Sequence, residues 1–545
     1  MHWADRIAKE IIASGKFKPY WVDDMKTPSG RIHVGSLRGM VIHNLIYVAL
    51  LEQGVKAKFT WVFDNHDPMD ALPVYLEKEK WSKYLGQPLF KIPSPDGKAE
   101  NYAKYFADEF ITVFNKIGCN PEVLWASDFY LSGKMNEDIR LCLSKADVIR
   151  KIYEGIYHKK LPTDWYPFQV VCPNCGKEST TKVTAWDGEK VTFECKVDAV
   201  DWTKGCGTKG KISPFSRKDH FAGKLPWKID WVVKWKIIGV TVEGAGKDHM
   251  TAGGSHDIAS EVCKKVLNYP VPYPIDYEHF LIGGKKMSSS KGLGVSAKEM
   301  SEILPPYLLR FLFVKTNYRQ AIDFDPRGNL AIPDLFDEYD KAWEAYDKGG
   351  DEKLARTYEL SQIKWEKACP QPPERSDGRR GFFVPRFRDI ANYLSQGFSL
   401  DEIVGKMAEI KTGRKNLPAG RQIDDSEMGI IEERVKYAKV WLESYAPDEY
   451  RFEMTEKVPD EVKSLSQSQG NYLKGIIKVY NDGDSAESLQ VSLYELAKQV
   501  QIPTKDAFAA IYIAFIGKTH GPRAGMLLAK FGKEKVIGRI REVAK

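Results

Sequence analysis

Hydrophobic and polar positions along the N-terminal part of the chain predict a helix, a strand, a second helix and a second strand in turn. Residues 1–15 mix charged and apolar positions as an amphipathic helix does, and the apolar residues 21–22 are typical of a strand end. Residues 28–30 predict a tight turn, and residues 32–40 read as the beginning of a helix. The β-rich run 56–67 ends in polar residues, as expected of a parallel strand that meets a ligand crevice. The series predicts an α/β domain with a parallel sheet.

Four polar residues end the second strand: Asp64, Asn65, His66 and Asp67. Side chains at the carboxyl end of a parallel strand reach the crevice in which ligands bind. We therefore expect these residues at the rim of a substrate site, with a simple polar turn as the alternative.

The pattern changes in the last third of the chain. Residues 370–380 are rich in proline and charge, as linkers are, and residues 382–545 show repeated helical periodicity with few strand-like runs. Aromatic and basic residues recur there at helical spacing: Arg434, Tyr437, Trp441 and Tyr445. Such a stripe is typical of core packing, with stacking on RNA bases as the alternative, so it identifies no base contact.

Composition limits the class of protein. The 545 residues suffice for several domains, and 43% hydrophobic residues support substantial cores, which excludes a disordered protein. The formal charge of +7 is compatible with an RNA partner without identifying one. We expect no signal peptide and no membrane span, because no uncharged apolar run of about 18 residues occurs. Eight cysteines in so long a chain do not make a disulfide framework, which favours a reducing cytoplasm. The sequence leaves the oligomeric state open and is compatible with a monomer.

Four of the cysteines cluster and predict a structural zinc site. Cys172 and Cys175 form a CxxC knuckle followed by glycine, whose tight turn points both thiolates at one ion. Cys195 and Cys206 are farther apart, but removal of residues 197–204 would leave a second knuckle of similar form. We therefore expect a four-cysteine zinc ribbon with an inserted loop, in which no position stays open for catalysis. Reduced structural or redox thiols are the alternative.

Residues 21–40 combine a strand end, a turn and a helix start, which suits a nucleotide site. The helix N-terminus offers unpaired N–H groups to phosphate, Gly35 lets a purine ring approach the backbone, and His33 can donate to charge on phosphate. Taken alone, a capped helix with a satisfied histidine explains the stretch as well. The run from His33 to Ser36 resembles the HIGH signature of class I aminoacyl-tRNA synthetases, and the TPSG before it is similar to the version in class I lysyl-tRNA synthetases.

A second motif, at residues 283–292, resembles the KMSKS loop of the same enzymes. Its glycines, serines and Lys286 suit a mobile lid that stabilises charge on the β and γ phosphates. A solvated basic linker would explain this loop alone, but two motifs in the expected order make coincidence a poor explanation. Two residues depart from the usual signatures, Ser36 in the first motif and Ser289 in the second, and Lys291 adds a positive charge two residues later.

The resemblance implies an ATP site and a mechanism. Catalysis would rest on His33, Lys286, the helix N-terminus and the Mg²⁺ that accompanies ATP, without a protein nucleophile. The residues that would contact ATP are His33, Gly35, Ser36, Asp248, Gly253, Lys286 and Ser290.

Two further stretches bear on the amino acid. Residues 227–231 resemble the family's WR-V-DW stretch, and residues 246–249 resemble its GKDH motif. A lysine substrate requires an aromatic face for its stem and polar or acidic groups for its ammonium. The residues that would bind lysine are Thr27, Trp227, His249 and Asp230, with Asp24 as the alternative source of charge. Met25 stands where the family has a small residue, and core packing is the alternative role for Trp227.

The resemblance covers essentially the whole chain. It implies that L-lysine and ATP form lysyl adenylate, from which lysine is transferred to the 3′ end of tRNA(Lys). The implied fold is a Rossmann-like catalytic domain in two halves, an insertion with the zinc ribbon, a connecting helical region and an all-α anticodon-binding domain. The corresponding boundaries are 1–95 and 221–295 for the two halves, 96–220 for the insertion, 296–360 for the connection and 361–545 for the last domain. Some relatives carry more metal ligands near residues 94–106, but only Asp96 and Glu100 suit that role in this stretch, so no second metal is expected.

Two other functions stay open. A nucleotidylyltransferase with an HxGH motif shares the phosphate chemistry, but it leaves the zinc insertion, the long spacing to the lid and the helical C-terminal half unexplained. A noncatalytic RNA-binding relative is expected to lose His33 or Lys286, and both are present.

Overall fold

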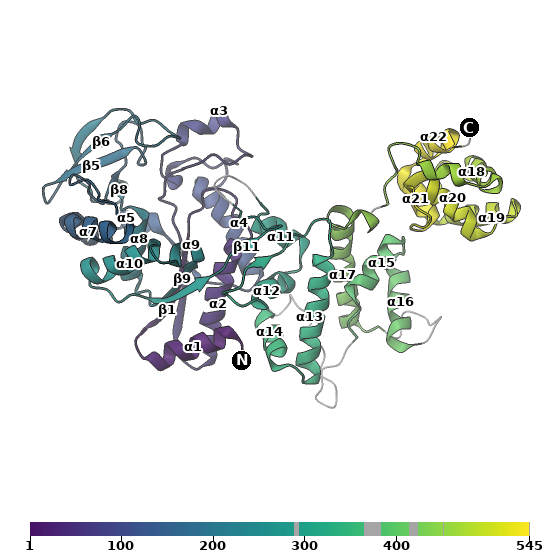
Figure 1. Ribbon diagram of the computed structural model, residues 1–545, viewed down its shortest axis with the longest axis horizontal. Coiled ribbons are helices and arrows are strands. Elements are labelled where there is room, and N and C mark those ends of the chain that lie inside the picture. The colour runs from purple at the N-terminus through teal and green to yellow at the C-terminus, as the bar shows by residue number, and fades with distance from the viewer. Residues whose placement is uncertain (288–293, 364–382, 414–422, 451, 544–545) are drawn as a thin grey trace. The chain divides into compact units, whose positions relative to one another are not determined.

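Two compact units make up the chain in the computed structural model, which describes residues 1–287, 294–363, 383–413, 423–450 and 452–543 (Figure 1). The first unit contains Met1–Asp325 and Ala342–Cys369, and the second contains Pro326–Lys341 and Pro370–Lys545. The linker predicted at residues 370–380 lies outside the described residues.

A five-stranded parallel sheet forms the centre of the first unit. Its strands are β1 (Tyr20–Lys26), β2 (Ala57–Phe63), β3 (Glu122–Trp125), β9 (Val242–Gly246) and β10 (Tyr273–Tyr277). They lie in the order β10-β9-β1-β2-β3, so the direction of winding reverses between β1 and β9. In sheets of this kind ligands bind beyond the carboxyl ends of the strands, at the point of reversal. The predicted parallel α/β sheet is therefore confirmed.

Helices cover both faces of the sheet. On one face α2 (Ser36–Glu52) packs against β1, β2 and β9, and α1 (Trp3–Ser14) and α12 (Pro306–Val314) pack against α2. On the other face α8 (Trp227–Ile238) and α10 (Ser255–Val262) share a core with the strand residues Val62 and Ala245. Burial on both faces explains why the strands lack a simple alternation of apolar and polar residues.

The chain between β2 and β9 adds helices and a small antiparallel sheet. The helices are α3 (Lys78–Trp81), α4 (Tyr102–Lys116), α5 (Ala126–Leu131), α6 (Asn136–Ser144) and α7 (Ala146–Tyr157). The strands are β4 (Gln169–Val170) paired with β8 (Gly223–Lys224), and the ribbon strands β5 (Thr181–Trp186), β6 (Val191–Cys195) and β7 (Lys209–Ile212). Strand β3 pairs with β2 in the parallel sheet. The sheet therefore includes residues beyond 95, where the sequence predicted the insertion to begin. A strand of four residues is too short to produce a recognisable pattern.

The remaining elements are mostly helical. In the first unit they are α9 (Lys247–Met250), β11 (Phe280–Leu281), α11 (Ala297–Ile303), β12 (Ile322–Asp323) and α14 (Glu352–Ser361). Helix α13 (Ala331–Lys348) crosses the boundary between the units. The others are α15 (Phe387–Ser395), α16 (Leu400–Thr412), α17 (Asp425–Ser444), α18 (Gln467–Val479), α19 (Ala486–Gln499), α20 (Thr504–Ile516), α21 (Ala524–Phe531) and α22 (Lys533–Val543). Every regular element that the structure describes after α14 is a helix, which confirms the predicted all-α C-terminal region.

The aromatic and basic stripe of α17 packs inside the second unit. Arg434 is 2% exposed and Trp441 1%, and Tyr437 is also buried. The Arg434 guanidinium pairs with the carboxylate of Asp340. Of the two roles considered for this stripe, core packing is the one that the structure supports.

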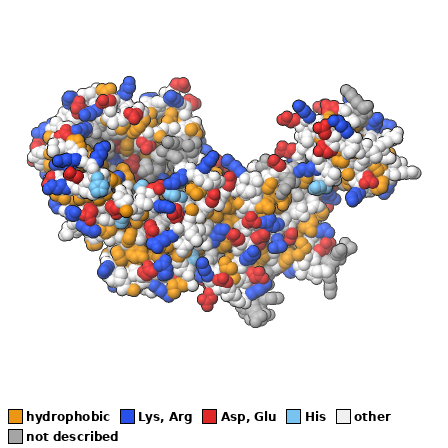
Figure 2. All heavy atoms as spheres, in the orientation of Figure 1, with side chains coloured by type: hydrophobic (Ala, Val, Ile, Leu, Met, Phe, Trp, Pro, Cys, Tyr) orange, Lys and Arg blue, Asp and Glu red, His pale blue; other side chains and the backbone are white. Residues whose placement is uncertain are grey.

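The surface carries charge of both signs. In Figure 2, Lys and Arg side chains are interspersed with Asp and Glu side chains over the visible face, in keeping with the small net charge. Within the described ranges no helix combines the length and the apolar character that a membrane crossing would require.

Candidate active site at the carboxyl ends of the parallel strands

A cavity of about 660 Å³ lies where the winding of the sheet reverses. Residues at the ends of four strands, and in the loops that follow them, form its walls. These are Met25, Lys26 and Thr27 after β1, Asp64 and Asp67 after β2, Gly246, Asp248 and His249 after β9, and Tyr277 and His279 after β10. The cavity thus occupies the position at which sheets of this topology bind ligands.

The first signature motif forms one wall of the cavity. His33, Gly35 and Ser36 line it at the N-terminus of α2. A Cβ atom on Gly35 would lie 2.9 Å from His33 Nδ1 and 3.1 Å from Met287 Cε, so only glycine fits without a shift. Burial, with a smaller contribution from the Lys26 charge, lowers the pKa of His33 to about 3, so its imidazole is neutral near pH 7. A neutral ring can still donate one N–H to a phosphate.

The two signature motifs come together in space. Val34 donates its backbone N–H to the carbonyl of Val295 at 3.0 Å, and Ala297 donates to Ile32 at 2.9 Å. Lys286 Nζ lies 2.9 Å from Asp248 Oδ2, and this bond is the main reason why the pKa of Asp248 is lowered. The structure therefore brings Lys286 and Met287 of the second motif next to Asp248 and Gly35 of the cavity wall, although the two motifs are about 250 residues apart in the sequence.

Three residues predicted to contact ATP are not among the residues that line the cavity. Lys286 reaches it only through its pair with Asp248, which does line it. Gly253 donates its backbone N–H to Asp257 Oδ2 at 2.7 Å and is absent from the cavity wall. Ser290 lies outside the described residues. Their roles stay predictions from the family resemblance.

An aromatic pair forms the opposite wall. Trp227, at the start of α8, is 45% exposed, and its ring centroid lies 5.5 Å from that of His249 at 69°. Both rings line the cavity. Trp231 and Trp235 of the same helix are buried instead, and both indoles donate to the Glu243 carboxylate, from Trp231 at 2.7 Å. Core packing therefore describes Trp235 fully, whereas the largely buried Trp231 also lines the cavity and the half-exposed Trp227 is mainly a cavity residue.

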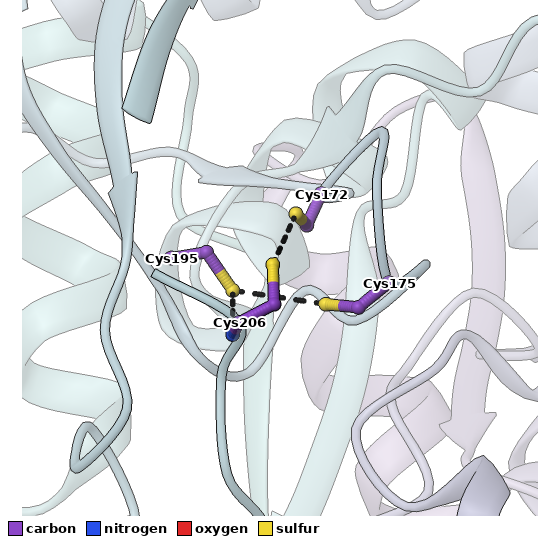
Figure 3. A group of neighbouring side chains, drawn as sticks. All are labelled: Cys172, Cys175, Cys195 and Cys206. Atoms are coloured by element: carbon purple, nitrogen blue, oxygen red, sulfur yellow. Dashed lines mark hydrogen bonds between the residues drawn. The ribbon is translucent and has the colours of Figure 1, made fainter. Parts of the chain in front are cut away.

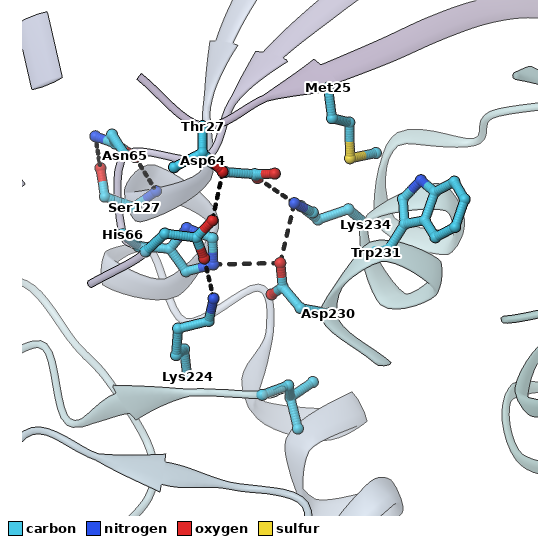
Figure 4. Close-up of polar contacts among 12 residues, drawn as sticks. Met25, Thr27, Asp64, Asn65, His66, Ser127, Lys224, Asp230, Trp231 and Lys234 are labelled. Carbon is cyan, nitrogen blue, oxygen red and sulfur yellow. Dashed lines mark hydrogen bonds and ion pairs between the residues drawn. The ribbon is translucent and has the colours of Figure 1, made fainter. Parts of the chain in front are cut away.

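Ion pairs among buried and half-buried residues form part of the cavity wall (Figure 4). Lys234 contacts Asp64 and lies 2.9 Å from Asp230, while Lys224 contacts Asp67. Asp67 in turn accepts the Thr27 hydroxyl at 2.6 Å. Burial alone would lower the pKa of Lys234, but the two carboxylates raise it above its usual value. Thr27 is thus held in the cavity wall by a charge network that begins on α8 and β8.

Asp230 belongs to this network and not to the cavity wall. It is 1% exposed, accepts the Tyr130 hydroxyl at 2.5 Å and contacts His66 Nε2 at 3.2 Å. Burial would raise its pKa, but Lys234 and His66 hold that pKa well below the usual value. The direct lysine contact predicted for Asp230 therefore finds no support. Asp24, the alternative, is buried but does line the cavity.

The four polar residues after β2 divide into two pairs. Asp64 and Asp67 line the cavity, as predicted for a substrate rim. Asn65 turns inward to Ser127, from whose backbone it accepts a hydrogen bond at 2.9 Å, and His66 is fully buried. Asp64, His66 and Asp230 have donor atoms within 4.8 Å of one another, which is a spacing seen around metal ions. The Lys234 ammonium already contacts both carboxylates, so this group is neutralised by the protein itself.

Sequence reasoning missed several polar residues of the cavity. Lys26, Lys224, Lys234 and Glu243 were not singled out, although all four line it. The signal for Lys234 was available, because it follows Asp230 by one helical turn and ion pairs form at that spacing. No comparable local signal exists for Lys224, which lies on a strand of two residues.

The four clustered cysteines converge on one point outside the cavity (Figure 3). Their sulfur atoms lie within 4.8 Å of one another, with 3.5 Å between Cys172 and Cys206 and 3.7 Å between Cys175 and Cys195. Four thiolates about 2.3 Å from a tetrahedral zinc ion would be about 3.8 Å apart, so the cluster fits zinc. The loop 197–204 between the second pair is held by Lys177, whose ammonium donates to Thr203 Oγ1 at 2.7 Å.

Known proteins resemble this chain over its whole length. A family model described as tRNA synthetases class I (K) matches residues 1–364, and one described as an anticodon binding domain matches residues 428–544. Lysine–tRNA ligase of Archaeoglobus fulgidus is 32% identical, with 99% of each chain covered. Lysine–tRNA ligase 1 of Methanosarcina acetivorans is 33% identical, with 100% of this chain and 98% of its own covered.

The likeness extends to the signature motifs described above. Both motifs fall inside the family match, and the helical C-terminal region contains the second match. With more than half of its residues matched by the family model and relatives above 30% identity over nearly the full length, the chain belongs to the class I (K) family of tRNA synthetases.

Proposed function

We propose that this protein is a lysine–tRNA ligase, which uses ATP to activate L-lysine and transfers it to tRNA(Lys). The observation that carries the proposal is the single cavity in which a nucleotide-binding wall at His33 faces an aromatic wall at Trp227 and His249. The relatives covered over their full length bear the same name. The anticodon-binding match at residues 428–544 supports a tRNA partner.

The nucleotide wall would hold ATP for attack on its α phosphate. His33 offers a neutral N–H donor, the N-terminus of α2 offers its backbone N–H groups, and Gly35 leaves room for the purine. Lys286 would leave Asp248 for the phosphates, which frees the Asp248 carboxylate for the ribose hydroxyls. Mg²⁺ bound with ATP would neutralise charge on the β and γ phosphates. Positioning and charge stabilisation then replace a protein nucleophile.

The opposite wall would hold lysine. The face of Trp227 suits the aliphatic stem and the cation, and His249 completes the aromatic corner. Asp24 and Glu243 supply acidic groups at the cavity, where an ammonium needs a partner. Thr27, fixed by Asp67, offers a polar contact on the same side. These roles are proposals for individual side chains within the family's reaction.

The cysteine cluster would hold a structural zinc ion. All four positions of a tetrahedral site are taken by protein sulfur, so the ion would organise the ribbon without taking part in chemistry. Four free thiols in close proximity suit a reducing compartment, and we place the protein in the cytoplasm on that basis.

Pyrophosphate exchange into ATP, measured with each of the twenty amino acids, tests the activation step. The proposal predicts exchange that depends on L-lysine and is weak or absent with L-arginine and L-ornithine. A nucleotidylyltransferase would exchange pyrophosphate only with its own phosphorylated co-substrate and with none of the amino acids, and a noncatalytic RNA-binding protein would give no exchange at all. Either result would exclude the proposed function.

A further inference from the structure

Lys26 differs from the other lysines that line the cavity. Lys224 is paired with Asp67, and Lys234 is paired with Asp64 and Asp230. Among the residues that the structure describes, no carboxylate lies within ion-pair distance of Lys26 Nζ and no group accepts a hydrogen bond from it. The last residue of β1 therefore brings an unpaired ammonium to the cavity wall.

Lys26 lines the same cavity as His33 at the nucleotide wall and His249 at the amino-acid wall, and its charge acts on both. It lowers the pKa of both imidazoles beyond the effect of burial. The carboxylates of Asp24 and Asp64 raise the pKa of Lys26 through their charges, against the effect of burial. Asp24 is already engaged by the Met25 N–H at 2.8 Å and by His43 Nδ1 at 3.3 Å, and Asp64 is engaged by Lys234.

Lys26 is only partly exposed, and an ammonium partly withdrawn from water without a counter-ion costs free energy that a bound anion can recover. The reaction proposed above brings two anions to this place, the α-carboxylate of lysine and the α phosphate of ATP. They repel each other as they approach, so a fixed positive charge in this cavity would favour their encounter.

We propose that Lys26 is a further catalytic residue, which binds the anionic junction where the lysine carboxylate meets the α phosphate. The inference rests on the proposed lysine activation. In that step a carboxylate oxygen forms a bond to the α phosphorus, the bond from that phosphorus to the bridging oxygen breaks, and its electron pair leaves with pyrophosphate. Lys26 transfers no proton and stays an ammonium throughout.

The test replaces Lys26 by methionine, which has a similar length and no charge. Lys26→Met should lower the rate of lysine-dependent pyrophosphate exchange by about 100-fold. Its Tm should stay the same or rise, because a partly buried charge without an ion-pair partner is removed. A structural lysine would instead lose stability. Lys56→Met, at an exposed position directly before the neighbouring strand β2, is the matched control and should leave both quantities unchanged. Lys26→Arg keeps the charge and should retain more activity than Lys26→Met.

Binding measurements identify the anion. Wild-type protein should bind L-lysine more tightly than L-lysinamide, which lacks the carboxylate, and AMP more tightly than adenosine, which lacks the phosphate. If Lys26→Met abolishes only the first preference, Lys26 binds the carboxylate, and if it abolishes only the second, Lys26 binds the phosphate. Loss of both places it between the two anions.

The inference would be overturned by a folded Lys26→Met variant that keeps both preferences and exchanges pyrophosphate at the wild-type rate. Failure of the proposed function is a separate outcome, because it would appear as wild-type protein that exchanges no pyrophosphate with lysine. In that case the comparison of AMP with adenosine still decides whether Lys26 binds phosphate.

Discussion

Lys286 Nζ lies 2.9 Å from Asp248 Oδ2, so the lysine of the second signature motif is paired with the residue expected to bind the ribose of ATP. Both side chains are more than half exposed, and such a pair contributes little to stability. We infer that ATP exchanges this contact for two others, with Lys286 on phosphate and Asp248 on ribose. The pair would keep the lid lysine beside the cavity before ATP binds.

Replacement of Lys286 tests this role. Lys286→Ala should lower the rate of lysine activation by roughly 100-fold, about 2.7 kcal/mol of transition-state stabilisation. Lysine binding measured without ATP should change much less. The adjacent, exposed Lys285 provides the control, and Lys285→Ala should leave the activation rate nearly unchanged. A Lys286→Ala variant with the normal rate would remove Lys286 from the mechanism.

The tryptophans of α8 allow a paired test of the lysine site. Trp227→Ala should weaken lysine binding by about 2 to 4 kcal/mol, because burial of the stem and the cation–π attraction are both lost. ATP binding and Tm should change little. Trp235→Ala removes a buried side chain that is bonded to Glu243 and lies outside the cavity lining, and it should instead cost about 3 to 5 kcal/mol of folding stability. Isothermal titration and thermal unfolding of both variants separate the two effects, and unchanged lysine affinity in folded Trp227→Ala would place Trp227 outside the site.

The cysteine cluster predicts one zinc ion per chain. Metal analysis of protein purified without chelator should find zinc, with Zn–S distances of about 2.3 Å by X-ray absorption. Cys206→Ser should lose the ion, whereas Cys142→Ser, which changes a buried cysteine outside the cluster, should keep it. Metal-free wild-type protein with normal folding would contradict the assignment.

The neutral state of His33 predicts an effect of acid on stability. In the unfolded chain a histidine takes up a proton near pH 6.5, but burial keeps His33 neutral in the fold down to a pKa of about 3. The free energy of unfolding therefore decreases as the pH falls below 6.5. The decrease is about 1 kcal/mol at pH 5, which allows for solvent screening of this half-buried ring. His33→Gln removes the group that takes up this proton. The free energy of unfolding of wild-type protein should therefore fall more between pH 7 and pH 5 than that of the variant. An equal decrease in both proteins would show that His33 titrates normally in the folded protein.

The sequence predicted the parallel sheet, the two signature motifs and the cysteine cluster because each leaves a local pattern. It singled out Trp227 through the family resemblance, but it could not show that Trp231 also lines the cavity while Trp235 is buried away from it, because burial is set by packing. The burial of Asp230 could not be predicted for a related reason. Its partners Tyr130 and His66 lie 100 and 164 residues away, and no local pattern reveals them. The isolation of Lys26 is likewise a property of its surroundings in space.

Charging of tRNA(Lys) with L-lysine tests the central claim most directly. Purified protein with ATP, Mg²⁺, radioactive lysine and tRNA(Lys) should form lysyl-tRNA, and a tRNA of different anticodon should accept far less. His33→Ala protein provides the matched negative control. The account predicts ATP-dependent attachment of lysine that the variant largely loses. Wild-type protein that is folded and zinc-loaded, yet attaches no lysine to tRNA(Lys), would contradict it.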